Sequence, residues 1–408
     1  MITFTIIQDA ADSLARTRIA RQASVKWCRF NDETLYWEDQ HQEQLLNNEL
    51  RQLGGNPQIG QGNLYLVVQV GNSFLSHFTH ARVVINKGRY LAVDLTAKEV
   101  EDIEQKPACF GICPLPENTT IFEVQKRIKR QPVPKIDSLV AMVSQTLLAE
   151  TITKFVGFRT RHSLTSEFSA AANWIKSNLE EHGFSVSKRT ISVGNSTSFN
   201  VVADRQGSGT NRRLVIVTAH LDSVNRMGGV AAIAPGADDN GSGAAGVLEI
   251  GRILATQSAE NDLRLILFGG EEQGLLGSQQ YVESLDSVDR FRIDSVINMD
   301  MIATLNTSTL TVLLEGAAIS QGLMDDLTDA AHSYTSLVVQ TSLNPFASDH
   351  VSFINASLPS LLTIEGADSA NHNIHTANDT LDHIHYGLAS EILKMNVAVV
   401  AQRLGIRD

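Results

Sequence analysis

From about residue 137 onward, short apolar runs with the composition of β-strands alternate with segments of helical periodicity. The runs are near-continuous rather than alternating, which is typical of strands buried on both faces of a sheet. This order favours an α/β fold, a three-layer αβα sandwich around a mixed, mostly parallel central sheet. The expected strands are 199–204, 214–220, 263–270, 295–300, 310–314 and 360–364, and the expected helices are 138–155, 165–182, one from near 242, one from about 274, 319–333 and 388–404.

Residues 1–130 differ in pattern and predict a separate domain. The stretch 63–95 contains β-rich runs separated by Gly- and Asn-containing turns, and a short charged helix is expected over 96–105. A basic, proline-containing linker, 131–137, separates this part from a domain over 138–408. We therefore expect a smaller, β-rich α+β N-terminal domain that packs on the larger one.

Composition excludes some classes of partner. The formal net charge is −12, which argues against binding to nucleic acid. No run of 18 apolar residues is present, so no membrane span is expected. Cys109 and Cys113 could close a disulfide loop, and three unpaired thiols, with Cys28, are an equal alternative. The N-terminal residues lack the features of a signal peptide, so the protein is either intracellular or has lost such a segment.

Acidic residues and histidines follow the ends of the expected strands or lie in loops beside them. Ligands of open α/β sheets bind beyond the carboxyl ends of the strands, so these side chains should converge on one patch. Carboxylate and imidazole are suitable zinc ligands. The residues are His220 and Asp222, Asp238 and Asp239, Glu271 and Glu272, Asp300, and His375. Asp238 competes with Asp239, and His375 competes with His372, His383 and His385.

The segments AHLDS, PGADDNGSGAAGVLE, LFGGEEQGLLGS, NMDM, ASDH and IHTANDTLD stand in one particular order along the chain. In these segments residues 138–408 resemble the zinc aminopeptidases of the bacterial leucyl aminopeptidase type, which are two-zinc exopeptidases. Residues 1–130 resemble no family in this way. The resemblance implies two zinc ions per chain and hydrolysis of the N-terminal peptide bond of peptides with a free N-terminus. It also implies a preference for large apolar N-terminal residues such as Leu.

The resemblance assigns five metal ligands. Asp239 would bridge both ions, and in the family the peptide bond that follows this residue is often cis. His220 and Asp300 would complete one zinc site. Glu272 and His375 would complete the other.

Further residues would act without holding metal. The resemblance implies that Glu271 is the general base for a water molecule that bridges the two ions. Asp222 would accept a hydrogen bond from His220 and fix its tautomer. Ser348 and Asp349 would orient the site, with a purely structural turn as the equal alternative.

Other functions of the same clan fit the sequence less well. A carboxypeptidase or acylase with a dimerisation lid would need an inserted domain, but only 75 positions separate Asp300 from His375. Glutaminyl cyclases lose the first histidine, and a receptor-like, non-catalytic homologue would have lost ligands.

We expect a secreted enzyme, with a cytoplasmic location as the alternative. Residues 1–130 are expected to be a masking propeptide that is cleaved near Lys126–Lys135. A permanent accessory domain is the less favoured alternative.

Overall fold

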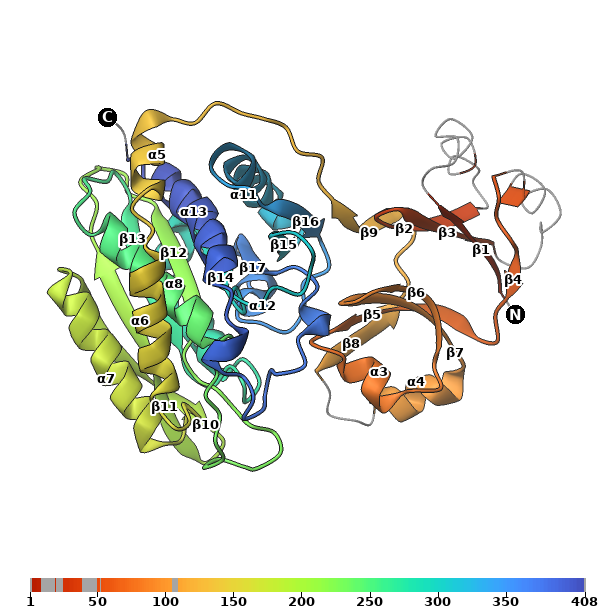
Figure 1. Cartoon of the computed structure of the whole chain (residues 1–408), viewed down its shortest axis with the longest axis horizontal. Coiled ribbons are helices and arrows are strands. Elements are labelled where there is room, and N and C mark those ends of the chain that lie inside the picture. The colour runs from red at the N-terminus through yellow and green to blue at the C-terminus, as the bar shows by residue number, and fades with distance from the viewer. Residues whose placement is uncertain are drawn as a thin grey trace. The chain divides into compact units, whose positions relative to one another are not determined.

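A computed structural model describes residues 2–8, 19, 25–38, 50–51, 53–104 and 109–406 (Figure 1). The chain forms two compact units. The smaller unit comprises Met1–Val124 and Thr341–Phe346, and the larger comprises Gln125–Gln340 and Ala347–Asp408. Most of residues 1–22, on which the expectation about a signal peptide rests, lie outside the described residues.

The larger unit is built on a mixed sheet whose four central strands, β13, β12, β14 and β17, are parallel. Strands β10 and β11 at one side and β15 at the other run antiparallel to their neighbours. This arrangement confirms the expected fold class, with β10 and β16 as additional strands. In spatial order the strands are β10 (Ser185–Val193), β11 (Ser196–Arg205), β13 (Asp262–Phe268), β12 (Leu214–His220), β14 (Ile293–Met299), β17 (Ser360–Glu365), β15 (Thr311–Gly316) and β16 (Val338–Ser342).

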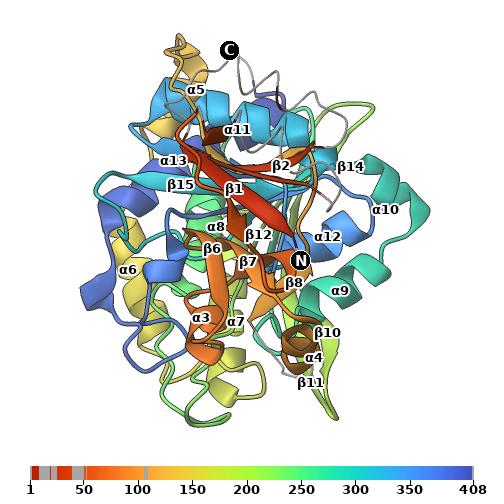
Figure 2. The ribbon, with the colours of Figure 1, turned by 90° about the vertical axis from the view of Figure 1, so that its right-hand side faces the viewer.

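Helices cover both faces of this sheet. Buried residues of α5, α6, α7, α8, α11 and α13 share one apolar core with strand residues such as Val215 and Val217. Residues of α9 and α12 form a second core with Ile216 and Phe268 on the opposite face of the sheet. Figure 2 shows α9 and α12 on the side of the sheet away from α6. The helices are α5 (Pro134–Val140), α6 (Gln145–Val156), α7 (Ser166–Glu181), α8 (Gly241–Leu254), α9 (Leu276–Glu283), α10 (Ser287–Arg292), α11 (Gln321–Tyr334), α12 (His350–Asn355) and α13 (Tyr386–Arg403).

One expected helix is divided. The segment 138–155 forms the end of α5 and most of α6, with a break between Val140 and Gln145. Ser144 causes the restart, because its side chain accepts a hydrogen bond from the main-chain N–H of Leu147. The main-chain N–H of Ser144 also donates to the Glu249 carboxylate of α8, at 2.8 Å. Apolar periodicity does not reveal this break because both helices bury residues in the same core.

The smaller unit contains two sets of strands. One is ordered β9-β2-β3-β1-β4 and the other β6-β7-β5-β8, with α3 and α4 packed on the second through an apolar core around Phe74 and Phe110. The charged helix expected over 96–105 is α4, and Gln105 lies outside the described residues. The elements are β1 (Thr3–Gln8), β2 (Val25–Phe30), β3 (Glu33–Glu38), β4 (Gln58–Ile59), β5 (Asn63–Gln69), α3 (Ser73–His77), β6 (Arg82–Lys87), β7 (Tyr90–Leu95), α4 (Ala97–Glu104), β8 (Phe110–Pro114) and β9 (Thr119–Val124).

A short segment from late in the chain, Thr341–Phe346, belongs to the smaller unit. Within it, the hydroxyl of Ser342 donates to the carbonyl oxygen of Ile121 at 2.7 Å. The buried guanidinium of Arg89 donates to the carbonyl oxygen of Phe346 at 2.9 Å. The smaller unit is therefore completed by residues that the chain supplies more than two hundred positions later.

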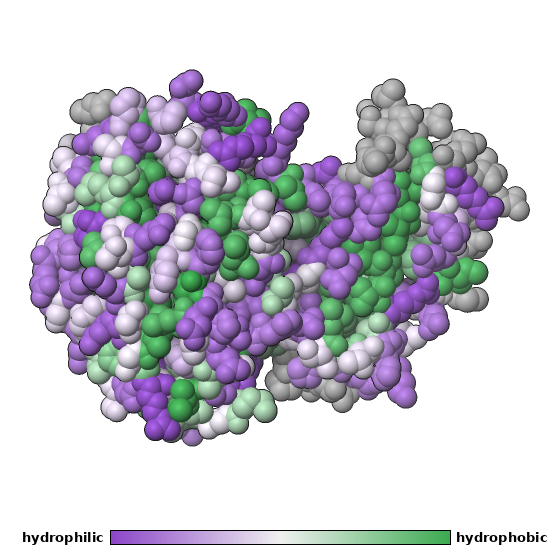
Figure 3. Space-filling model, in the orientation of Figure 1, coloured by the Kyte–Doolittle hydropathy of each residue, from purple (hydrophilic) through white to green (hydrophobic). Residues whose placement is uncertain are grey.

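No single helix among the described residues has the length and apolarity of a membrane span. The pair α5 and α6, bent by 44°, meets that test only when the two helices are taken together. The visible face of the larger unit mixes hydrophilic and apolar residues (Figure 3). All three cysteines lie in the described part of the chain and are unpaired there.

Candidate metal centre

The ends of three parallel strands bring the first site residues to one edge of the sheet. His220 is the last residue of β12 and pairs in register with Phe268, the last residue of β13. Two glycines then lead from β13 to Glu271 and Glu272, and Gly270 takes a left-handed φ of 71° that allows the chain to turn sharply. Asp300 directly follows β14. Strand length and register therefore place these side chains, as the sequence predicts.

Two groups of possible ligands lie at this edge. Ligand atoms of His220, Glu271 and Asp300 lie within 4.8 Å of one another, as do those of Asp239, Glu272 and His375. Nε2 of His220 is 3.2 Å from Oδ1 of Asp300. Nε2 of His375 is 3.1 Å from Oε2 of Glu272. The five ligands that the resemblance implies thus converge, and Glu271 lies among them.

Asp239 lies between the two histidines. Its Oδ1 is 3.2 Å from Nε2 of His220, and its Oδ2 is 3.1 Å from Nε2 of His375. Its peptide bond to Asn240 is cis. The Asp379 carboxylate accepts hydrogen bonds from the main-chain N–H of Asp239 and of the residue before it, both at 2.9 Å. The loop that carries Asp239 is therefore fixed by its main chain, while both oxygens of its side chain face the centre.

Asp238 points elsewhere. Its carboxylate accepts hydrogen bonds from the N–H of Ala303, the hydroxyl of Thr304 and the amide of Asn371, at 2.6 to 3.1 Å. Burial raises the pKa of Asp238, and burial together with this neighbouring carboxylate raises the pKa of Glu365 well above its usual range. Asp238 therefore holds the loop after β14 and does not lie between the histidines.

Asp222 organises the turn that carries the two glutamates. Its carboxylate accepts the N–H of Glu271 at 3.3 Å and that of Glu272 at 3.2 Å. Nδ1 of His220 is 3.0 Å from the main-chain oxygen of Asp222 and 3.7 Å from its carboxylate. The main-chain oxygen of Asp222, rather than its carboxylate, is therefore the group within hydrogen-bond distance of His220 and sets its tautomer. The Asp222 carboxylate instead holds the main chain of the two glutamates.

The centre concentrates hydrogen-bond acceptors in a largely buried environment. Burial, followed by repulsion from Glu272 and Asp300, raises the pKa of Glu271 well above its usual range. Burial opposes protonation of His220, but Asp300 and Glu271 raise its pKa well above the usual value. Buried Oε1 of Glu272 has no hydrogen-bond partner among the described residues. An unpartnered carboxylate oxygen beside imidazole nitrogens is the donor set that zinc takes, so these residues fit the metal.

Ser348 connects Asp300 to the sheet. Its hydroxyl donates to Oδ2 of Asp300 at 2.7 Å and accepts the Asn298 amide at 2.8 Å. Asn298 in turn accepts the hydroxyl of Thr218 in β12 at 2.8 Å. Burial raises the pKa of Asp349 to about 7, and the charges of His220 and Asp300 also act on this carboxyl group.

The other histidines near the last helix lie outside both ligand groups. His372 and His383 are exposed, and Nδ1 of His385 accepts the N–H of Leu388 at the start of α13. Three further residues that contribute to this site were not predicted from the sequence: Arg161, Asn298 and Asp379. Asp379 could have been predicted, because it lies in the IHTANDTLD segment. Nothing in the sequence distinguishes Arg161.

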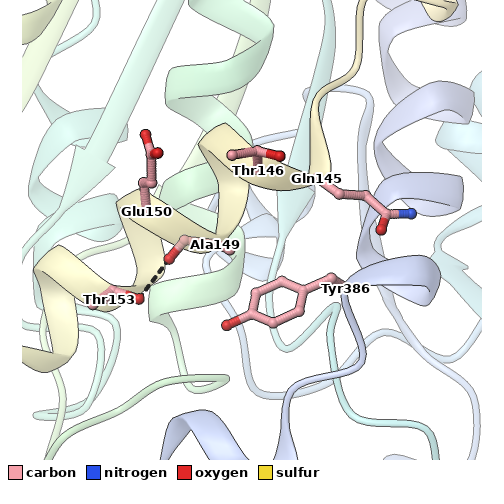
Figure 4. Close-up of a pocket in the computed structure, with 6 residues that line it drawn as sticks. All are labelled: Gln145, Thr146, Ala149, Glu150, Thr153 and Tyr386. Carbon is pink, nitrogen blue, oxygen red and sulfur yellow. Dashed lines mark hydrogen bonds between the residues drawn. The ribbon is translucent and has the colours of Figure 1, made fainter.

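A separate hollow of about 560 Å³ lies between α6 and the first residue of α13 (Figure 4). Tyr386 faces it from α13, and Gln145, Thr146 and Glu150 line it from α6. The hydroxyl of Thr153 donates to the carbonyl oxygen of Ala149 within the same helix, at 2.7 Å. No residue of the two ligand groups lines this hollow, so we assign it no part in the chemistry.

The fold and the centre define an α/β protein with a candidate two-metal site at the carboxyl edge of its sheet. The sequence profile of the family described as peptidase family M28 matches residues 200–400. Leucine aminopeptidase 1 of Ajellomyces capsulatus is 29% identical over 290 residues, which cover 66% of this chain and 74% of the relative. Leupeptin-inactivating enzyme 1 of Streptomyces exfoliatus is 30% identical over 206 residues, 49% of this chain and 43% of that protein. The alignment thus spans less than half the length of the Streptomyces protein.

The fold is also similar to that of a solved structure. BSAP, a zinc aminopeptidase from Bacillus subtilis, superposes with a TM-score of 0.57 at 18% identity over 65% of this chain and 96% of that one. Residues 200–400 therefore belong to peptidase family M28, and together with the aminopeptidase relatives they indicate a zinc aminopeptidase.

Proposed function

We propose that the larger unit removes N-terminal residues from peptides with a free N-terminus, using two zinc ions. The observation that carries this proposal is the position of Asp239, whose two oxygens lie 3.2 and 3.1 Å from the Nε2 atoms of two histidines. One carboxylate in this position can serve two cations. The residues that would hold zinc are His220, Asp239, Glu272, Asp300 and His375.

Glu271 is the proposed general base. Zinc bound at this centre would polarise the scissile carbonyl group and lower the pKa of a water molecule. The Glu271 carboxylate takes the proton of the attacking water and passes it to the amine nitrogen as the C–N bond breaks. Burial raises the pKa of Glu271, which favours uptake of the proton from water. Asp222 assists by holding the main chain of this turn.

The proposed substrates are peptides whose first residue is large and apolar, such as Leu. The names of the relatives support this preference, since one of them is a leucine aminopeptidase.

We also propose that residues 1–130 are a propeptide that masks the centre, that 131–137 is the linker and 138–408 the peptidase domain. A location outside the cytoplasm is proposed with it. Fractionation of the source cells, with the activity assayed in each fraction, tests that location.

The test is metal content combined with activity on Leu-p-nitroanilide. We expect two zinc ions per chain, and activity that is lost on chelation and returns with zinc. Glu271→Gln should keep both ions and lower kcat by about a thousandfold, because the proton acceptor is removed. Glu283→Gln, at an exposed position of α9, is the matched control and should retain full activity.

Contrary outcomes are distinguishable. Full activity in Glu271→Gln would exclude its role as base. Release of C-terminal residues or acyl groups, without removal of N-terminal residues, would indicate a carboxypeptidase or acylase. A folded protein with neither zinc nor activity would indicate a non-catalytic, receptor-like homologue.

A further inference from the structure

A buried cation lies beside the candidate metal centre, in the loop between α6 and α7. Arg161 has no exposed surface, and among the described residues of the larger unit it is the only Lys or Arg that is buried. A buried charge is costly unless other groups compensate it. The proposed chemistry gives Arg161 no part, so its position calls for a separate explanation.

The guanidinium group of Arg161 joins two segments that carry site residues. Its Nε donates to the carbonyl oxygen of Leu221 at 2.9 Å, directly after His220. Its Nη1 and Nη2 donate to the carbonyl oxygens of residues 235 and 236 at 2.6 and 2.8 Å, shortly before Asp239. The planar fork of arginine makes these bonds at once, which lysine cannot reproduce.

The two segments lie in close contact around this fork. The main-chain N–H of Arg161 donates to the hydroxyl of Ser223 at 3.0 Å, and that hydroxyl donates to the carbonyl oxygen of Ala234 at 2.8 Å. Gly236 has a φ of 56°, and a Cβ atom there would lie 2.5 Å from Cβ of Ser223 and 2.6 Å from the carbonyl oxygen of Asp239. The close packing at this point therefore leaves no room for a side chain at Gly236.

The charge of Arg161 is balanced by the centre rather than by a direct ion pair. Within the described part of the chain, no carboxylate oxygen lies within 4.0 Å of its guanidinium, and its partners are carbonyl oxygens. Burial lowers the pKa of Arg161 to about 10, while Asp379, Asp239, Asp222 and Glu272 raise it. The guanidinium thus stays charged at neutral pH, and these four carboxylates are the opposite charges that act on it.

We propose that Arg161 is a positioning residue that holds the acidic centre together before metal ions bind. It braces the loop of Asp239 against the end of β12, and its charge offsets the repulsion among the carboxylates. The inference rests on the proposed metal binding. Bound cations would take over the charge compensation, so loss of Arg161 should harm the metal-free protein more than the zinc-loaded one. A merely structural residue would affect both forms equally.

The test compares melting temperatures of the full-length chain after chelation and after reloading with zinc. Arg161→Met should lower the Tm of the metal-free form by about 5 °C more than that of the loaded form. Arg161→Lys keeps the charge and loses the fork, so the two forms should lose similar amounts. Arg264→Met is the matched control, because the Arg264 side chain pairs with Asp204 and Tyr281 and should affect both forms equally.

Equal losses in both forms of Arg161→Met would overturn the inference. Failure of that variant to fold in zinc-rich and zinc-depleted medium alike would overturn it as well, whereas folding in the zinc-rich medium alone supports it. A wild-type protein that takes up no zinc would defeat the proposed function itself, and this inference with it.

Discussion

At the scale of single residues, the candidate centre depends on side chains that hold no metal. Ser348 donates to one oxygen of Asp300, while His220 lies 3.2 Å from the other. Asn298 and Thr218 fix the orientation of Ser348 through two further hydrogen bonds of 2.8 Å. Hydrogen bonds of this kind orient a ligating carboxylate and thereby raise metal affinity.

Ser348→Ala removes the hydroxyl that orients Asp300. We expect zinc affinity to fall about tenfold, because the carboxylate gains freedom to rotate. Competition with a fluorescent zinc chelator measures the change. The matched control is Ser352→Ala, which removes a buried hydroxyl bonded to Ser278 at 2.8 Å. Equal affinity losses in the two variants would contradict the proposed role of Ser348.

At the scale of elements, one carboxylate links α13 to the segment between α11 and β16. Glu391 accepts the N–H of Ser336 and the ammonium group of Lys394, both at 2.7 Å. Burial opposes ionisation, but these hydrogen bonds lower the pKa of Glu391 below its usual value. A carboxylate with a lowered pKa stabilises the fold above its unfolded-state pKa and loses that contribution as the pH falls through the folded-state pKa.

Glu391→Gln should therefore reduce stability at neutral pH and have little effect in acid. We expect a loss of about 1.5 kcal/mol near pH 7, typical of a hydrogen bond to a charged group. Urea unfolding near neutral pH and again in acid below the lowered pKa of Glu391 measures this difference. Glu283→Gln, at an exposed site on another helix, should change stability little at either pH. A loss that is the same at both pH values would show that ionisation of Glu391 contributes nothing.

At the scale of the whole molecule, the largely exposed segment 125–133 before α5 is the expected site of proteolytic cleavage. Lys126 and Lys129 are exposed, whereas Arg130 pairs with Asp329 at 2.7 Å. The N–H of Val133 donates to the hydroxyl of Tyr334 at 3.0 Å. The segment has no regular secondary structure, which favours proteolysis.

A lysine-specific protease should cut this segment first. If residues 1–130 mask the centre, activity on Leu-p-nitroanilide should rise as the intact chain disappears from a gel. Replacement of Lys126 and Lys129 by Gln should delay both changes together. Unchanged or lower activity in a cut but still folded product would favour a permanent accessory domain. That outcome would agree with the contribution of Thr341–Phe346 to the smaller unit.

Sequence patterns predicted the architecture of the larger unit and the residues of the candidate centre. Apolar runs alternating with helical segments fix a sheet with helices on both faces, because each run must bury both sides. His220, Glu272 and Asp300 follow such runs, and the ends of parallel strands meet at one edge. The order of the six sequence segments then indicated the zinc aminopeptidase family.

The contacts between loops become visible only in the folded structure. It brought Asp239 between the histidines and turned Asp238 towards Thr304, although the two are neighbours in the sequence. It buried Arg161 beneath the same loop and placed Thr341–Phe346 in the smaller unit. Periodicity reports only which face of an element is buried, whereas these contacts depend on the paths of loops that carry no periodic signal.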